Sequence, residues 1–327
     1  MFLRTTTTVL TAAALLSAGG LTASAAPAPA PAPQGGWQKV GDDIKSGVSG
    51  LAVTGSGPRH GATRALVVRD NKKPGENRVA RVDYRPGSDT RSGTRSGARH
   101  PVSVEPLAWK GAAEPIDLEA IEAVPGARGE YVALASRGLV YHLKATGRDL
   151  QVLDTSPLPA IAEGDDYESF ALTSRHGKLA AVWADRGAGK KRPATVHAAP
   201  FSFNKYGEAD FGAVTTARLR APYPTGDVRH ASDISVTRSG RLVISSASDA
   251  GDDGPFASAV LDAGKLSVTR SGKVRLTVAK SPDVIRKFKG VKIEAVECLP
   301  GSGGKALLGT DDENAGGSLN SATVCGK

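Results

Sequence analysis

The chain has 327 residues, with 42 Lys and Arg against 33 Asp and Glu, and a formal net charge of +9. Aromatic residues make up only 5% of it, which argues against an extended stacking surface for sugars or bases and leaves Trp109, Trp183 and Tyr223 as the candidates for local stacking. The two Cys and six His show no zinc-type spacing, and hydrolase, nucleotide-binding and nicotinamide signatures are absent. After the N-terminus no segment reaches the roughly 18 apolar residues of a membrane span.

The first 25 residues are predicted to be a signal peptide. Arg4 precedes an apolar run over residues 9–18, and Ala23-Ser24-Ala25 is a small-x-small cleavage site. An Ala/Pro-rich linker follows over residues 26–36, where the composition favours an extended chain. We therefore expect a secreted, soluble protein with one folded domain over residues 37–327.

One short pattern recurs five times in that domain. The copies are VSGLAV, LEAIEAV, YESFAL, ASDISV and IEAVECL, and they begin at Val48, Leu118, Tyr167, Ala231 and Ile293. The second residue of each copy precedes a polar residue at a near-constant offset, namely Ser49 to Asp70, Glu119 to Ser136, Glu168 to Asp185, Ser232 to Asp249 and Glu294 to Asp311. Two short strands joined by a Gly-bearing turn return the chain to the same level, so each copy predicts a β-hairpin.

Repeated hairpins of this kind predict an all-β fold, a single β-propeller with five four-stranded blades. The last unit has only one strand, 319–325, after its hairpin. We expect the N-terminal segment 37–44 to supply the missing strand and to close the ring, because closure removes exposed sheet edges.

The two cysteines, Cys298 and Cys325, fall in the first and third strands of this last blade. An exported protein meets an oxidising environment, and a disulfide between them is favoured over two free thiols.

Two segments carry much of the positive charge, Gly87 to His100 and Lys280 to Lys292. The first is rich in Gly, Ser and Arg and is predicted to be a mobile loop. For both, a solvated loop that adds solubility is favoured, with attraction to a polyanion, such as cell-wall phosphates or a phosphorylated substrate, as the alternative.

The acidic residues of the repeats are the candidate site. In a propeller the first strand of each blade lines the central channel, so we expect a ring at one mouth made of Glu119, Glu168, Asp185, Asp249, Glu294 and Asp311. Converging carboxylates must be protonated, paired with Arg or bound to a cation, and an oxygen-rich site suits calcium. The alternative is that each acid caps loop amides.

Three of these motifs carry a family resemblance. The sequences DLEAIE at 117–122, DYESFA at 166–171 and KIEAVE at 292–297 resemble the blades of phytase-like β-propellers, including the group named for esterase-like activity of phytase. The resemblance implies calcium at the acidic mouth and, in true phytases, a calcium-held phosphate ester attacked by water. Glu119, Glu168, Asp185, Glu294 and Asp311 match the acidic sites by position, whereas Ser49 and Ser232 depart from them.

Two functions follow from these observations. The favoured one is a secreted, monomeric propeller that binds an extracellular ligand, an anion being one option, with calcium at the acidic mouth; nothing points to nucleic acid. The alternative is a calcium-dependent phosphoester hydrolase, for which Arg137, Arg186 and His230 are the candidate basic groups. The sequence names no nucleophile or base and leaves open whether the protein is an enzyme.

Overall fold

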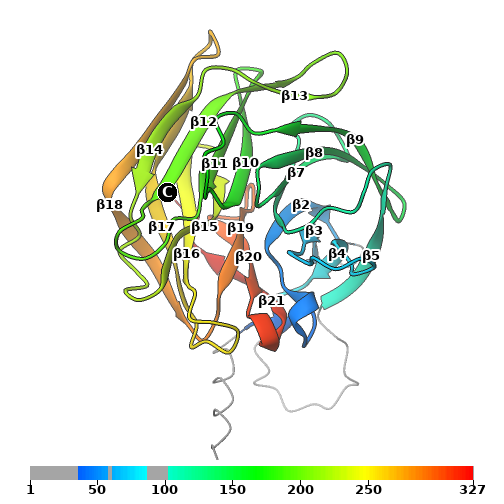
Figure 1. Cartoon of the computed structure of the whole chain (residues 1–327), viewed down its shortest axis with the longest axis vertical. Coiled ribbons are helices and arrows are strands. Elements are labelled where there is room, and N and C mark those ends of the chain that lie inside the picture. Colours follow the sequence, from blue (N-terminus) through cyan, green and yellow to red (C-terminus); the bar gives the residue numbers. More distant parts are fainter. Residues whose placement is uncertain (1–35, 58–60, 87–101, 327) are drawn as a thin grey trace, which may run out of the picture.

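The computed structural model describes residues 36–57, 61–86 and 102–326 (Figure 1). The predicted signal peptide, nearly all of the linker and the segment 87–100 lie outside these residues. In the described part the only helices are two short 3-10 turns, η1 (Ile44–Ser46) and η2 (Glu313–Ala315). No helix there is long and apolar enough to cross a membrane.

The strands form five consecutive meanders, here called units. The first contains β2 (Gly50–Ser56), β3 (Thr63–Val68), β4 (Val79–Tyr84) and β5 (Val102–Lys110). The second contains β6 (Leu118–Ala123), β7 (Glu130–Ala135), β8 (Leu139–Thr146) and β9 (Asp149–Pro157). The third contains β10 (Tyr167–Arg175), β11 (Lys178–Asp185), β12 (Ala194–Phe203), β13 (Ala209–Phe211) and β14 (Thr215–Leu219). The fourth contains β15 (Val228–Val236), β16 (Arg241–Ser248), β17 (Ala257–Val268) and β18 (Val274–Lys289). The fifth contains β19 (Ile293–Cys298), β20 (Lys305–Asp311), β21 (Gly317–Thr323) and β1 (Gln38–Lys39).

The first strands of the units surround a common axis. Strand β2 contacts β6, β6 contacts β10, β10 contacts β15, β15 contacts β19, and β19 returns to β2. Figure 1 shows β2, β10, β15 and β19 towards the middle of the molecule and β5, β9 and β18 at its periphery. A short parallel pairing of β5 with β9 joins the first two units into one eight-stranded sheet. This arrangement is a β-propeller, as the repeats predicted.

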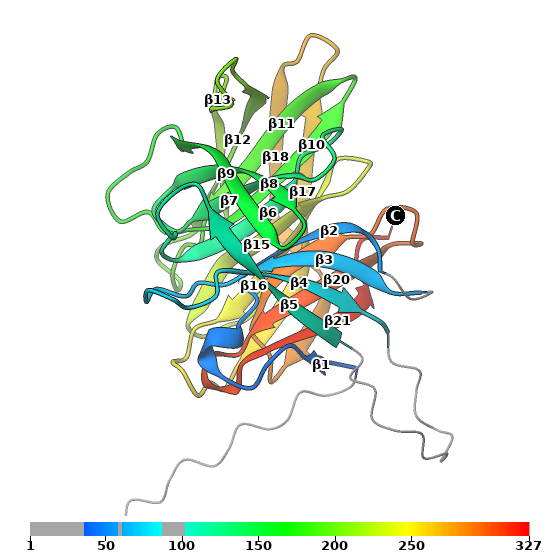
Figure 2. The same ribbon diagram turned by 90° about the vertical axis from the view of Figure 1, so that its right-hand side faces the viewer.

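The last unit is completed from the N-terminal end, as expected. Gln38 pairs with Leu319, and the Val40 amide donates to the Gly317 carbonyl at 2.9 Å. Strand β1 lies beside β21 in Figure 2. The strand is shorter than predicted because the chain turns into η1 at Ile44 instead of continuing along the sheet.

The disulfide between Cys298 and Cys325 is confirmed, with 5.8 Å between the two Cα atoms. The strands nearest to the two residues, β19 and β21, are not neighbours in the sheet. The bridge forms because Cys298 ends β19 and Cys325 follows β21, where its amide donates to the Gly304 carbonyl at 2.7 Å. The end of the chain is thereby tied to the closing unit.

The basic segment 280–292 differs from the prediction, because most of it is strand. Residues 280–289 continue β18, and Lys289, Phe288 and Lys287 pair with Ala257, Ser258 and Ala259 of β17. Phe288 is buried, so an apolar residue among the charged ones fixes this end of the strand against the core. The third unit also differs, since two short strands, β13 and β14, both pair with β12 where one outer strand was expected.

Close contact between units requires glycine at one point on the axis. A Cβ atom on Gly50 would lie 2.7 Å from Ala120 Cα and 2.8 Å from the Glu119 carbonyl oxygen. Glycine therefore lets β2 approach β6 closely, and this approach fixes the backbone beside Glu119.

Candidate functional site

Three inner strands place a Glu as the extra residue of a β-bulge. The pairing of β6 with β7 passes directly from Leu118 to Ala120, so Glu119 has no partner in the ladder. The same irregularity occurs at Glu168 in β10 and at Glu294 in β19. A bulge twists the strand locally and redirects the side chain of its extra residue. The repeated Glu is thus explained by a repeated backbone device at one end of the channel.

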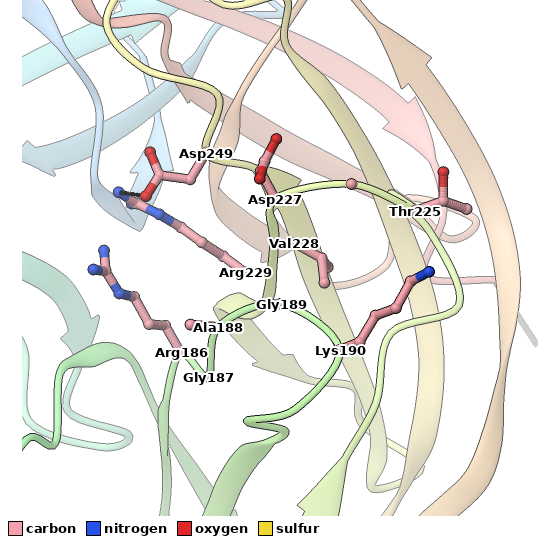
Figure 3. Close-up of a pocket in the computed structure, with 11 residues that line it drawn as sticks. Arg186, Gly187, Ala188, Gly189, Lys190, Thr225, Asp227, Val228, Arg229 and Asp249 are labelled. Atoms are coloured by element: carbon pink, nitrogen blue, oxygen red, sulfur yellow. Dashed lines mark hydrogen bonds and ion pairs between the residues drawn. The ribbon is translucent and has the colours of Figure 1, made fainter.

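The fourth unit contributes a cation near this position. In β15 the irregular pairing extends from Arg229 to Asp233. The Arg229 Nη1 atom lies 3.1 Å from Glu168 Oε1 and 2.9 Å from Glu294 Oε1, while Nη2 lies 3.0 Å from Asp249 Oδ2 (Figure 3). Burial by itself would lower the pKa of the guanidinium, but these three acids raise it above its ordinary value. One buried cation therefore joins acids from three units.

Two further cations complete this arrangement. Lys292, almost fully buried, places Nζ 3.0 Å from Glu294 Oε1 and also contacts Glu313. Arg186 donates from Nη1 to Glu168 Oε1 at 2.9 Å, and its Nη2 lies 3.1 Å from Asp166 Oδ2. We call the set Glu168, Arg186, Arg229, Asp249, Lys292 and Glu294 the mouth network. Glu168, Lys292 and Glu294 are buried and Asp249 is exposed, and the ion pairs among these groups hold them in fixed positions.

Two carboxylates at the same mouth stay outside these ion pairs. Asp70 and Glu119 have no hydrogen bond or ion pair with any described residue, and both are partly exposed. Burial, with a contribution from Glu294, raises the pKa of Asp70 to about 6. Burial, with Glu168 and Glu294, raises the pKa of Glu119 well above its ordinary range. Both groups are accessible and gain or lose protons in a range that ordinary surface carboxylates do not reach.

A cleft of about 630 Å³ lies beside the network, between the segment that follows β11 and the segment that precedes β15. In Figure 3, Arg186 and Arg229 lie on one side of the cleft, next to Asp249, and Lys190 and Thr225 lie on the other. Lys190 is exposed, and its ammonium group forms no ion pair with a described residue. The cleft therefore combines paired cations on one wall with an unpaired cation on the other.

The six predicted site residues divide into three groups. Glu168, Asp249 and Glu294 share Arg229, as described above. Glu119 and Asp311 lie close enough to Glu294 for its charge to raise the pKa of each, after the larger effect of burial. Asp185 lies apart from the network.

Asp185 stabilises a loop, as the capping alternative predicted. Its carboxylate accepts from the amides of Asp166 at 3.1 Å and Gly187 at 3.0 Å, and it also pairs with Arg192. These contacts hold the segment that forms one wall of the cleft.

Of the three basic candidates, only Arg186 belongs to the network. Arg137 donates to the Asp165 carbonyl at 3.4 Å. His230 is buried, its Nδ1 accepts from the Ala221 amide at 3.0 Å, and its Nε2 lies 2.8 Å from the Gly189 carbonyl. Accepting at Nδ1 requires the neutral ring with the proton on Nε2. Because its two ring nitrogens contact Ala221 and Gly189, His230 holds two loops together.

Sequence reasoning missed Arg229 and Lys292. The available signal was the mismatch in the fourth copy, where Ser232 replaces the leading Glu and a basic residue stands three positions earlier. The irregular pairing of β15 brings that earlier residue into the ring, and a regular two-residue alternation does not predict it.

Calcium at the mouth stays a prediction. Within the described ranges, no group of three or more His, Cys, Asp or Glu side chains is placed to hold a metal ion. Glu168, Asp249 and Glu294 as placed do not fit a calcium site, because each accepts from a guanidinium or ammonium group instead.

No protein-family model matches the chain, and no curated protein matches it in sequence. Among solved structures, it is similar to a GH43 β-1,3-galactosidase with galactodeoxynojirimycin, at 9% identity and a TM-score of 0.46, over 88% of this chain and 93% of that one. It is also similar to a GH43 protein from Bacillus licheniformis, at 15% identity and a TM-score of 0.40, over 71% and 44% of the two chains. A third structure, described as a glycoside hydrolase, has 12% identity and a TM-score of 0.44, over 86% and 62%.

These findings correct the phytase-like assignment. The three structures named above are described as GH43 proteins or as a glycoside hydrolase, and no family model matches the chain. The motifs that suggested it are short, and the structure accounts for them by the bulge that carries Glu119, Glu168 and Glu294. These motifs mark the start of the inner strands. They are therefore a property of the propeller architecture and do not specify one enzymatic activity.

Proposed function

We propose that the protein is an exported five-bladed β-propeller that binds a carbohydrate at the charged mouth of its channel. The blade count is supported by the closed cycle of contacts among β2, β6, β10, β15 and β19. Export is supported by the leader pattern in residues 1–25 and by a disulfide, which persists in oxidising compartments.

The observation that carries the proposal is the pair of free carboxylates beside fixed cationic donors. A sugar hydroxyl both donates and accepts hydrogen bonds. Asp70 and Glu119 offer acceptors that no described residue uses, and Arg186 and Arg229 are held in place by ion pairs. Groups that are already ordered lose less conformational entropy when a ligand binds.

Recognition at this site is polar. Of the aromatic residues that were candidates for stacking, Trp183 is fully buried, and the Tyr223 ring lies under Lys287 Nζ at 4.7 Å. Trp109 packs edge-on against Tyr141 and donates to the Ala113 carbonyl at 3.1 Å. The ligand is therefore expected to be bound by hydrogen bonds and charge, with little contribution from stacking on rings.

Calorimetric titration with a panel of neutral and acidic oligosaccharides tests the proposal. For the best ligand, Glu119→Gln and Asp70→Asn should each weaken binding by about tenfold, the loss expected when one hydrogen bond is removed. The matched control is Asp210→Asn, an exposed acid on the outer strand β13, which should leave the affinity unchanged. The proposal is rejected if no oligosaccharide binds, or if both mouth variants bind as the wild type does.

A second candidate function, glycoside hydrolysis, is favoured by the difference between the two free carboxyl groups. Burial raises the pKa of Glu119 well above its ordinary range, which favours the protonated form that a general acid requires, whereas the pKa of Asp70 is about 6. Glu119 then donates its proton to the glycosidic oxygen as the C–O bond breaks, and Asp70 takes a proton from the water that adds to the anomeric carbon.

Release of reducing sugar from the bound oligosaccharide measures this reaction. Hydrolysis by the wild type that is lost in Glu119→Gln, with binding retained at a reduced level, supports the catalytic function. Binding without hydrolysis in the wild type leaves the protein a carbohydrate binder.

A further inference from the structure

Outside the mouth, a run of exposed positive charge lies on the outer strand of the fourth unit. Strand β18 is the last strand of its sheet, pairs only with β17, and runs along the periphery of the molecule (Figure 1). Its first residues face β14 of the third unit, whereas the part after Val278 carries Lys280, Arg286, Lys287 and Lys289. We call these four residues the β18 strip.

The cations of the β18 strip have no compensating charge. All four are exposed, and none forms an ion pair with a described residue. The residues directly across β17 are uncharged: Ala257 faces Lys289, Ala259 faces Lys287 and Val260 faces Arg286. The one acid in this part of the strand is Asp283, which pairs in register with another acid, Asp262. The strip therefore keeps its full positive field towards solvent.

Two of these cations are also positioned by aromatic rings. The Arg286 guanidinium lies over the Phe288 ring at 5.1 Å, and Lys287 Nζ lies over the Tyr223 ring at 4.7 Å. Such contacts orient a cation without neutralising it. They also cover the two rings, so neither offers an open face on which a nucleic-acid base can stack.

Protection of a sheet edge against aggregation explains some charge on an outer strand, but not this pattern. In β5, Glu105 pairs with Arg81 and Arg148, and β9 carries Asp149 and Asp154 with no cation at all. Beyond their short mutual pairing, β5 and β9 meet that requirement with acids or with paired charges. The β18 strip instead presents four cations that are all exposed and without an ion pair to a described residue.

We propose that the β18 strip is a docking surface for a linear, base-free phosphate polymer. Arg and Lys both bind phosphate oxygens well, and successive side chains on one face of a strand, such as Lys287 and Lys289, are about 7 Å apart along it. This spacing lets neighbouring cations engage successive groups of a repeating polyanion. The surface is separate from the mouth and does not depend on the proposed carbohydrate site.

Binding of long-chain inorganic polyphosphate by the full chain tests the proposal. A strip variant in which Lys280, Arg286, Lys287 and Lys289 are changed to Gln is compared with a control variant that changes four other exposed cations to Gln, Lys110, Arg128, Lys178 and Lys205. Both variants lose the same net charge. At 50 mM salt the strip variant should bind at least about tenfold more weakly than the control, and its binding should depend less on salt, as expected when local charges make the contact.

Several results would overturn the proposal. Equal losses in the two variants would mean that net charge alone attracts the polymer, and absence of wild-type binding would remove the surface altogether. Tighter binding of heparin would refute the choice of phosphate, and tighter binding of single-stranded DNA would refute a base-free partner. Because all eight substitutions are at exposed positions, unchanged melting temperatures should show that both variants fold.

Discussion

Replacing Asp70 by Asn should stabilise the protein at neutral pH while weakening its site. The folded-state pKa of Asp70 is about 6, against an ordinary value of 3.8, because burial and Glu294 disfavour the charged form. The folded protein therefore holds a proton that the unfolded chain has released, and the free energy of unfolding falls as pH rises from about 4 to about 6. Since each pKa unit corresponds to about 1.4 kcal/mol, ionisation of Asp70 lowers the free energy of unfolding of the wild type by on the order of 2–3 kcal/mol over this range.

Asn cannot ionise, so Asp70→Asn avoids that loss. Urea unfolding at pH 4 and pH 7, with a chelator present, should show the variant close to the wild type at pH 4 and about 2–3 kcal/mol more stable at pH 7. The partly exposed position lets water solvate the amide, so no new unpaired polar group is buried. Asp210→Asn, on the outer strand β13, controls for loss of one exposed acid and should show no such pH dependence.

Two results would refute this reasoning. A gain of equal size at pH 4 and pH 7 would show that packing, not ionisation, distinguishes the two side chains. A variant that is less stable at both pH values would show that Asp70 makes a favourable interaction in its charged form.

Three further predictions concern the mouth network, the disulfide and calcium. Arg229→Gln should lower the free energy of unfolding by about 3–5 kcal/mol in urea titrations at pH 7, because it leaves Glu168 and Glu294 without the cation they share. Changing both Cys298 and Cys325 to Ser should cost about 3–4 kcal/mol by the same measurement, since the bridge closes a loop of 27 residues in the unfolded chain. If calcium binds at the mouth by displacing the cations paired with Glu168 and Glu294, it should raise the melting temperature of the wild type, and Glu168→Gln combined with Glu294→Gln should abolish that rise.

Each of these measurements has its own control. Arg238→Gln removes an exposed Arg of the fourth unit and should change the free energy of unfolding by less than about 0.5 kcal/mol. If Arg229→Gln changed it as little, the interpretation of Arg229 as a shared cation would be wrong. For the disulfide, reductant should lower the stability of the wild type to that of the double Ser variant and leave the variant unchanged. For calcium, magnesium at the same concentration separates specific binding from ionic strength, and a flat wild-type response would speak against a calcium site.

The sequence was sufficient for the architecture. The five copies with leading residues such as Glu119 and Glu168 recur because every unit begins its inner strand in a similar way, and that periodicity is a local property of the chain. The short last unit likewise required a strand from elsewhere, and the pairing of Gln38 with Leu319 provides it. The disulfide followed from two cysteines in one blade of a chain that is predicted to be exported.

The chemistry of the mouth was decided by the tertiary structure. Asp185 and Asp249 occupy equivalent places in the hairpin pattern, but one holds a loop and the other pairs with Arg229. Arg229 lies outside the repeat and enters the ring only through the irregular pairing of β15. Periodicity specifies which strand face a residue occupies, because side chains alternate along a strand. It does not specify which cation from another unit, 61 positions away in the case of Glu168 and Arg229, compensates a buried carboxylate. That choice depends on long-range packing around the axis, and it leaves Asp70 and Glu119 as the carboxylates free to bind.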